Sequence, residues 1–327
     1  RHVKDMYLVK TTVGAPELEQ WKYPLPGDSA IIMINRVVID IENSKLIRFK
    51  MPADARRSTL CDDIACNGSL SDTYWSKDGS QVAFVSVSRD HKKSNLRVAN
   101  ALTGDVRDVF EETVPTQYES GQGDVNWKFL PASNEFIWYS ERNNFGHLYL
   151  YDLTTGHLKN QITNGSFTIT RVIDVDEEKR TILFEACGSG SNPYYKNYYS
   201  INFNGKNLKR LTPADGNHSI IRSPDNKYFI DTYSSPNTAP QIILSDAKGK
   251  KLMDLETADI SQLLASGWQA PIPFTFRSAN NAFDLYGLLY LPPNIDATKK
   301  YPVINNIYPG PQGGTIGYWG FSASRSD

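Results

Sequence analysis

The feature that most constrains the fold is a repeat of turn-forming residue pairs that contain glycine. Each pair follows a short apolar segment, and the glycines are separated by 52, 49 and 44 residues (positions 104, 156, 205 and 249). The four pairs are Thr103-Gly104, Thr155-Gly156, Asn204-Gly205 and Lys248-Gly249. Glycine supplies the positive φ that a tight hairpin needs. We therefore expect one strand to end and another to begin at each pair.

A second turn-like segment precedes each glycine pair. These segments are Trp75-Ser-Lys-Asp-Gly79, Leu130-Pro-Ala-Ser-Asn134, Val175-Asp-Glu-Glu-Lys179 and Ser223-Pro-Asp-Asn226. Each is followed by an apolar run rich in Val, Ile, Phe and Tyr, which are the residues that strands favour. These runs are Val82–Val85, Phe136–Tyr139, Thr181–Phe184 and Tyr228–Ile230. The order strand, turn, strand, loop, strand, glycine turn, strand is therefore predicted for every unit.

Four-stranded units that recur about every 40–50 residues are typical of the blades of a β-propeller. One earlier unit is predicted from the strands Ala30–Ile34, Val37–Ile41 and Lys45–Phe49. The sequence thus predicts an all-β fold, an incomplete β-propeller of about five four-stranded blades. A pair of β-sandwiches would also contain short strands, but its turns would not return in a fixed four-strand phase.

The repeat ends after about residue 255. Ala258–Ala265 has the apolar spacing of a short helix, and Gly267 closes it. The strands predicted beyond it, Phe274–Arg277, Asp284–Leu291 and Val303–Tyr308, no longer keep the blade spacing. We therefore divide the chain into a partial propeller (residues 1–256), a linker helix (257–271) and the start of a second domain (272–327).

Charge and composition exclude some functions. Lys and Arg together number 35 and Asp and Glu 36, so the net charge is −1 and gives no overall field for nucleic acid or anionic lipid. The longest apolar run, Ala30–Ile34, is far shorter than the roughly 18 residues of a membrane helix. Cys61 and Cys66 could form a loop disulfide or remain two free thiols, and both possibilities stay open. Cys187 is expected in the core.

Several kinds of catalytic and ligand-binding motif are absent. The chain has no Gly-x-Ser-x-Gly nucleophile elbow, no phosphate-binding loop and no dinucleotide fingerprint. Its five histidines are scattered without metal-ligand spacing. We expect no cofactor and no metal, a structural hydrogen bond for His147, and a loop position for His218.

The loop Thr116-Gln-Tyr-Glu-Ser-Gly121 is the candidate for contact with a substrate. Tyr118 and Glu119 are its candidate binding residues, and a solvated linker between blades is the alternative. The nearby Ser140-Glu141-Arg142 block predicts a structural network, since a half-buried Arg needs a carboxylate partner.

The C-terminal part carries a Pro/Gly turn with a tyrosine after an apolar strand. Tyr301–Asn305 reads as a buried strand, and Tyr308-Pro-Gly-Pro-Gln312 follows it. This arrangement resembles the oxyanion loop of an α/β-hydrolase, where a phenol O–H at a strand tip can donate to the developing alkoxide. Taken alone, a tyrosine at a strand tip is more often an edge-packing residue.

With these segments in this order, the chain resembles the prolyl oligopeptidase family of serine peptidases, in its dipeptidyl peptidase IV branch. The resemblance covers essentially the whole chain. It rests on Tyr23-Pro-Leu-Pro-Gly27, Trp75–Gly79, Trp138-Tyr-Ser-Glu-Arg142, Gly146-His-Leu-Tyr-Leu-Tyr-Asp152, Asp284-Leu-Tyr-Gly287, Tyr301-Pro-Val-Ile304 and Tyr308-Pro-Gly-Pro-Gln312.

The resemblance implies a propeller that caps an α/β-hydrolase domain with a Ser-Asp-His triad. It implies that residues 272–327 open that domain and that Tyr308 is an oxyanion-hole donor. A glutamate pair that holds the substrate's amino terminus would normally precede the segment at Tyr23. No adjacent pair precedes Tyr23, and Glu111-Glu112, which lies downstream in another blade, does not inherit that role.

By this resemblance the chain is expected to be a fragment, and the longer protein to release dipeptides or short N-terminal segments, often after Pro. Its partners would be peptides with a free amino terminus, and a homodimer is possible. The expected location is the periplasm or the outside of the cell. Without the triad, this chain alone is expected to be inactive. A non-catalytic propeller scaffold and a catalytically dead homologue are the alternatives.

Overall fold

The computed structural model describes residues 3–11, 14–55, 73–120, 125–188, 192–292, 295–306 and 319–324, together with the backbone of 65–66 and 69–70. Contacts divide the chain into two compact units, and the division passes through β15 (His147–Asp152). The first unit consists of residues 1–142 and 150–159, and the second of 143–149 and 160–327.

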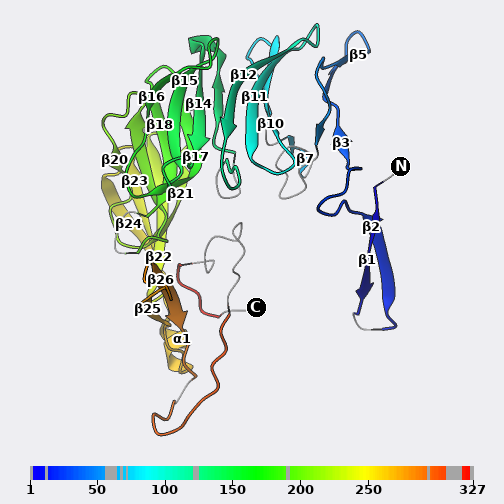
Figure 1. The fold of residues 1–327 in the computed structure, drawn as a ribbon. Coiled ribbons are helices and arrows are strands. Elements are labelled where there is room, and N and C mark those ends of the chain that lie inside the picture. The colour runs from blue at the N-terminus through cyan, green and yellow to red at the C-terminus, as the bar shows by residue number, and fades with distance from the viewer. Residues whose placement is uncertain are drawn as a thin grey trace. The chain divides into compact units, whose positions relative to one another are not determined.

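In the part of the chain that the structure describes, four sheets have four strands each, and within each sheet every strand pairs with the next along the chain (Figure 1). The first contains β9 (Thr73–Trp75), β10 (Gln81–Val87), β11 (Lys93–Asn100) and β12 (Val106–Thr113). The second contains β13 (Lys128–Leu130), β14 (Glu135–Ser140), β15 and β16 (Leu158–Gln161). A 3-10 turn, Pro131–Ser133, joins β13 to β14.

The remaining two four-stranded sheets lie in the second unit and are antiparallel. One contains β17 (Thr168–Asp176), β18 (Thr181–Cys187), β19 (Asn197–Asn202) and β20 (Lys209–Arg210). The other contains β21 (Asn217–Arg222), β22 (Tyr228–Ser235), β23 (Thr238–Asp246) and β24 (Lys251–Thr257). The strands predicted around each turn are therefore present in all four repeats.

The turn between the third and fourth strands of these sheets uses the residues that the repeat predicts. Gly104, Gly156, Gly205 and Gly249 have φ values of 75°, 69°, 77° and 80°. In the second sheet, the Asp152 carboxylate accepts the backbone N–H groups of Thr154 (3.0 Å) and Thr155 (2.8 Å). An acidic side chain that satisfies the turn's own amides, followed by a glycine in the left-handed region, makes a tight hairpin.

The predicted earliest unit is built differently from the other four. Among the described residues it forms two separate two-stranded sheets. One pairs β4 (Val37–Asp40) with β5 (Lys45–Arg48), and the other pairs β3 (Met33–Ile34) with β6 (Asp54–Ala55). Farther along the chain, β7 (Ala65–Cys66) pairs with β8 (Ser69–Leu70). The side chains of Cys61 and Cys66 lie outside the described residues.

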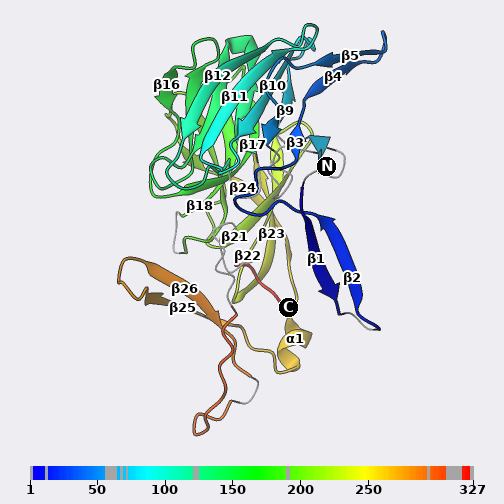
Figure 2. The same ribbon diagram turned by 45° about the vertical axis from the view of Figure 1, so that its right-hand side comes forward.

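Two further hairpins each form a two-stranded sheet of their own (Figure 2). β1 (Asp5–Lys10) pairs with β2 (Glu17–Lys22), and β25 (Ile272–Arg277) pairs with β26 (Asp284–Leu289). The predicted helix is present as α1 (Ser261–Ala265), so it begins three residues later than expected. The limits of the predicted domains stay predictions.

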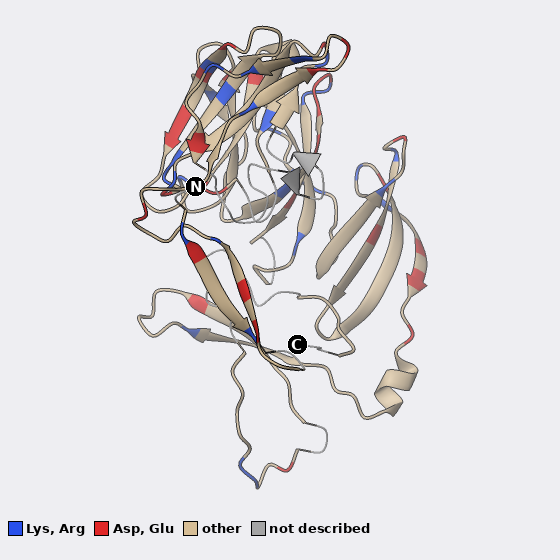
Figure 3. Ribbon diagram, turned by 90° about the vertical axis from the view of Figure 1, so that its right-hand side faces the viewer, with Lys and Arg blue, Asp and Glu red and all other residues tan. Residues whose placement is uncertain are grey.

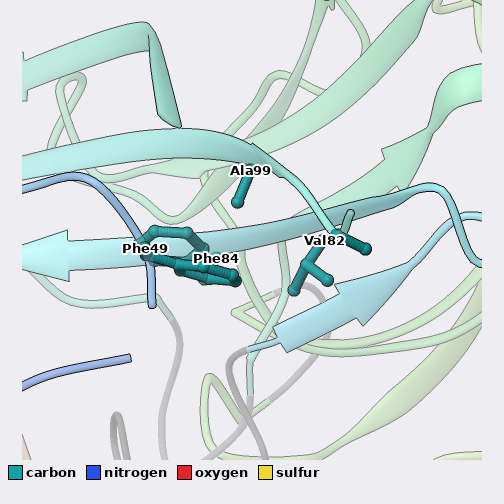
Figure 4. Close-up of a cluster of buried hydrophobic side chains, with 5 residues drawn as sticks. Phe49, Val82, Phe84 and Ala99 are labelled. Carbon is teal, nitrogen blue, oxygen red and sulfur yellow. The ribbon is translucent and has the colours of Figure 1, made fainter. Parts of the chain in front are cut away.

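Each unit has its own apolar cluster. In the first, the rings of Phe49 and Phe84 stack 5.5 Å apart, and Val82, Ala99 and Ala101 are buried with them (Figure 4). In the second, Tyr198, Leu211 and Phe229 are buried together. Basic and acidic residues both occur on the strands and turns (Figure 3). Among the described residues, no helix has the length and apolar character needed to cross a bilayer.

Candidate functional site

The loop that follows β12 carries Tyr118, and this residue is buried inside the first unit. Its backbone N–H donates to the carbonyl oxygen of His91 (2.6 Å). Its ring stacks on Trp138 of β14 with the ring centroids 5.6 Å apart and the planes inclined by 26°. Only 6% of Tyr118 is exposed. Tyr118 therefore anchors the loop to the sheet, and its contact with a substrate stays a prediction.

Glu119, the neighbour of Tyr118, is half-buried and belongs to a group of carboxyl groups. Its Oε1 accepts a hydrogen bond from Gln117 Nε2 (2.7 Å). Glu141, directly after β14, accepts the Tyr139 hydroxyl (3.1 Å). Partial loss of hydration raises the pKa of Glu141, and the negative charges of Glu119 and Glu112 add to the rise. The structure thus brings the predicted Glu119 close to Glu141.

Glu112 is the centre of a buried polar network that the sequence did not single out. It lies on β12 with 8% exposure. Its carboxylate accepts hydrogen bonds from Trp138 Nε1 (2.6 Å) and from the Ser140 hydroxyl, and it forms an ion pair with Arg142 (3.3 Å). The prediction that Arg142 has a carboxylate partner in a structural network is confirmed. The alternation of side chains along a strand could have identified Glu112, because neighbouring residues point to opposite faces. On β12, Glu112 points inward and Glu111 outward.

His147 has the structural role that was predicted. It is 1% exposed, Nδ1 lies 3.2 Å from the Thr163 hydroxyl, and Nε2 lies 3.1 Å from the carbonyl oxygen of Gly165. Burial lowers the pKa of His147, while the Gly165 hydrogen bond opposes that shift.

The prediction that His218 is a loop residue is wrong. It lies on β21 with 3% exposure. Its Nδ1 is 2.9 Å from both carboxylate oxygens of Asp231, and its Nε2 is 3.0 Å from the carbonyl oxygen of Ala214. The buried partner lies on the adjacent strand, so neighbours in sequence could not reveal it.

Tyr308, the predicted oxyanion donor, lies outside the described residues, and its role stays a prediction. The segment before it departs from the expected strand. Residues 303–306 form no strand, and Val303 and Ile304 are 88% and 91% exposed. The apolar run suggested a buried strand, but no strand of the described part pairs with it, and a strand needs a neighbour to satisfy its backbone groups.

The described residues contain no group of three or more His, Cys, Asp and Glu side chains that could hold a metal ion. Cys187 is a free thiol, partly buried at the end of β18, and burial raises its pKa. Its position fits the predicted packing role.

The chain is similar to known peptidases along most of its length. Residues 1–240 match the family described as the dipeptidyl peptidase IV (DPP IV) N-terminal region. Dipeptidyl peptidase 8 of Homo sapiens is 31% identical over 148 residues, which are 43% of this chain and 16% of that protein.

Two solved structures have the same fold. A Bacteroides ovatus protein assigned as a dipeptidyl aminopeptidase IV matches with a TM-score of 0.77 and 23% identity, over 98% of this chain and 46% of that one. Dipeptidyl peptidase 4 of Porphyromonas gingivalis matches with a TM-score of 0.69 and 20% identity, over 92% and 40%. The predicted propeller fold is confirmed, and the chain spans less than half of each of these proteins.

Proposed function

Because the chain belongs to the family of dipeptidyl peptidase IV N-terminal regions, we propose that it is the substrate-gating propeller part of a serine peptidase. The complete protein would release dipeptides or short peptides from free amino termini, often after Pro. The observation that carries this proposal is the family match over residues 1–240 together with a shared fold over 98% of the chain.

The loop around Tyr118 and Glu119 is the proposed peptide-facing element of the propeller. Its support is chemical: an ammonium group gains a charge-assisted hydrogen bond from a carboxylate such as Glu119. Glu119 also lies close enough to Glu141 to raise the pKa of Glu141, and two neighbouring carboxyl groups favour a cation over an anion.

Tyr308 is the proposed oxyanion-hole donor, as the Tyr308-Pro-Gly-Pro-Gln312 segment suggests. One phenol can stabilise a developing alkoxide but cannot supply a nucleophile or a base. The chain alone is therefore proposed to be inactive, and turnover to require a Ser-Asp-His triad from the rest of the protein. We also propose a homodimer and a periplasmic or extracellular location, and both rest on the resemblance alone.

A release assay tests this function. The full-length protein and residues 1–327 are each incubated with Gly-Pro-p-nitroanilide, with and without a serine-directed fluorophosphonate. The proposal expects nitroaniline release by the full-length protein, its loss with the inhibitor, and none from residues 1–327. Turnover by residues 1–327 would overturn the need for the triad, and a silent full-length protein would favour a scaffold or a dead homologue.

A further inference from the structure

Two carboxylates in the first unit occupy equivalent places in successive repeats. Asp54 of β6 accepts the Ser86 hydroxyl (2.7 Å) and pairs with Arg97 (3.2 Å). Glu112 of β12 accepts the Ser140 hydroxyl and pairs with Arg142. Each serine lies on the second strand of the sheet that follows the carboxylate. The acid and the serine therefore join successive repeats in the same way, whereas the arginines come from different places, Arg97 from β11 and Arg142 from the segment after β14.

The two repeats differ two residues before the serine. Phe84 occupies that position before Ser86, and Trp138 occupies it before Ser140. Both rings are fully buried. The indole Nε1–H of Trp138 donates to Glu112 (2.6 Å), whereas a phenyl ring has no donor. Glu112 thus accepts a hydrogen bond from the Trp138 ring in addition to its contacts with Ser140 and Arg142.

The ring that Glu112 holds is the one on which Tyr118 stacks. The backbone of the loop carrying Tyr118 is attached at several points: Val114 N–H donates to the Lys92 carbonyl (2.9 Å), Tyr118 N–H to the His91 carbonyl (2.6 Å), and Asn126 N–H to the Ser120 carbonyl (3.2 Å). The buried Tyr118 ring adds its stacking contact with Trp138 to these bonds. We therefore expect this stacking to help hold residues 114–120 in place.

We infer that Glu112 is the positioning residue of the peptide-recognition loop, acting through Trp138 on Tyr118 and hence on the backbone that carries Glu119. This inference rests on the proposed function for the statement that the loop meets a peptide. A hydrogen bond that the indole donates to a carboxylate fixes the ring more firmly than a bond between two neutral groups would. A loop ordered in advance loses less entropy when a peptide binds.

Amide hydrogen exchange of the segment 114–120 in the full-length protein tests the positioning. The variants are Glu112→Gln and Trp138→Phe. The second gives position 138 the phenyl ring that Phe84 has in the preceding repeat. Asp54→Asn is the matched control, because it weakens the equivalent fastening without touching Trp138. We expect exchange about tenfold faster in both test variants and unchanged exchange in the control. Unchanged exchange in Trp138→Phe, or an equal change in Asp54→Asn, would overturn the inference.

Steady-state kinetics of the same variants with Gly-Pro-p-nitroanilide test the consequence for recognition. The expected result is KM about tenfold higher with kcat within about twofold of wild type, and normal KM for Asp54→Asn. Faster exchange with an unchanged KM would refute the recognition role. If the wild-type protein releases no dipeptide, the proposed function fails, while the exchange result still decides whether Glu112 positions the loop. Should Glu112→Gln not fold, Trp138→Phe alone decides both readouts.

Discussion

The imidazole of His147 is held in one neutral form by its two neighbours. Thr163 Oγ1 accepts the Leu148 N–H (3.0 Å), so its own proton is free to donate to His147 Nδ1. The carbonyl oxygen of Gly165 can only accept, so Nε2 carries the ring proton. A second proton, on Nδ1, would require the Thr163 hydroxyl to turn and would place a charge on a buried ring.

Because the folded protein favours a neutral His147, we expect its stability to fall at acidic pH. The unfolded chain protonates His147 near its ordinary pKa of 6.5, whereas burial lowers the pKa in the folded chain. The unfolded state therefore binds more protons below pH 6.5, and stability falls as pH falls, by at most about 1.4 kcal/mol per pH unit. Unfolding free energies of wild type and His147→Gln, measured from pH 7.5 to 5.5, should show a shallower slope for the variant. Parallel curves of unfolding free energy against pH for the two proteins would refute this role of His147.

A second residue-scale prediction concerns the Tyr198 phenol, which donates to the buried Glu185 carboxylate (2.8 Å). Tyr198 is 1% exposed, and burial followed by the Glu185 charge raises its pKa. Tyr198→Phe should lower the unfolding free energy by about 1.5–3 kcal/mol, because it removes a hydrogen bond to a charged group. The control Tyr228→Phe, at a side chain 45% exposed, should change it by less than about 0.5 kcal/mol. Equal effects in urea denaturation would contradict the contact.

At the scale of elements, the glycine turns serve two purposes. Gly156 and Gly79 both have positive φ, 69° and 70°. A side chain at Gly156 would collide with the carbonyl oxygen of Val109 on β12, whereas a side chain at Gly79 would meet no atom within 4 Å. Gly156 thus shapes its hairpin and also lets the turn approach the neighbouring strand closely.

Alanine substitutions at Gly79 and Gly156 separate the cost of a positive φ from the cost of a steric clash. Gly79→Ala should cost about 1–2 kcal/mol, the price of a left-handed alanine. Gly156→Ala should cost at least about 3 kcal/mol, because the carbonyl of Val109 must also move. Thermal unfolding of both variants measures the difference. Equal losses would show that the turn can retreat from β12 freely.

The same elements show what the sequence could and could not predict. Hairpins around Gly104, Gly156, Gly205 and Gly249 were predictable because turn chemistry is local. The Glu112–Trp138 contact and the His218–Asp231 pair were not, since each joins residues on different strands whose register the sequence does not state. The predicted strand at 303–308 failed over 303–306 because apolar character alone does not supply a pairing partner.

At the scale of the whole molecule, the family match covers residues 1–240 and the shared fold covers 98% of the chain. The proposed oxyanion donor, Tyr308, lies beyond the segment that the family match covers. A scaffold and an enzyme part would share the four-stranded sheets equally. They differ at Tyr308, since only an enzyme needs a hydroxyl there to meet a developing oxyanion. The central claim is therefore that this chain contributes to catalysis.

The kinetics of Tyr308→Phe in the full-length protein test that claim most directly. With Gly-Pro-p-nitroanilide, the account predicts kcat lower by about 10²–10³-fold and KM nearly unchanged, because the phenol would act on the transition state and not on the bound substrate. Circular dichroism and thermal unfolding of the variant should match wild type. A correctly folded Tyr308→Phe protein with wild-type kcat would contradict the account.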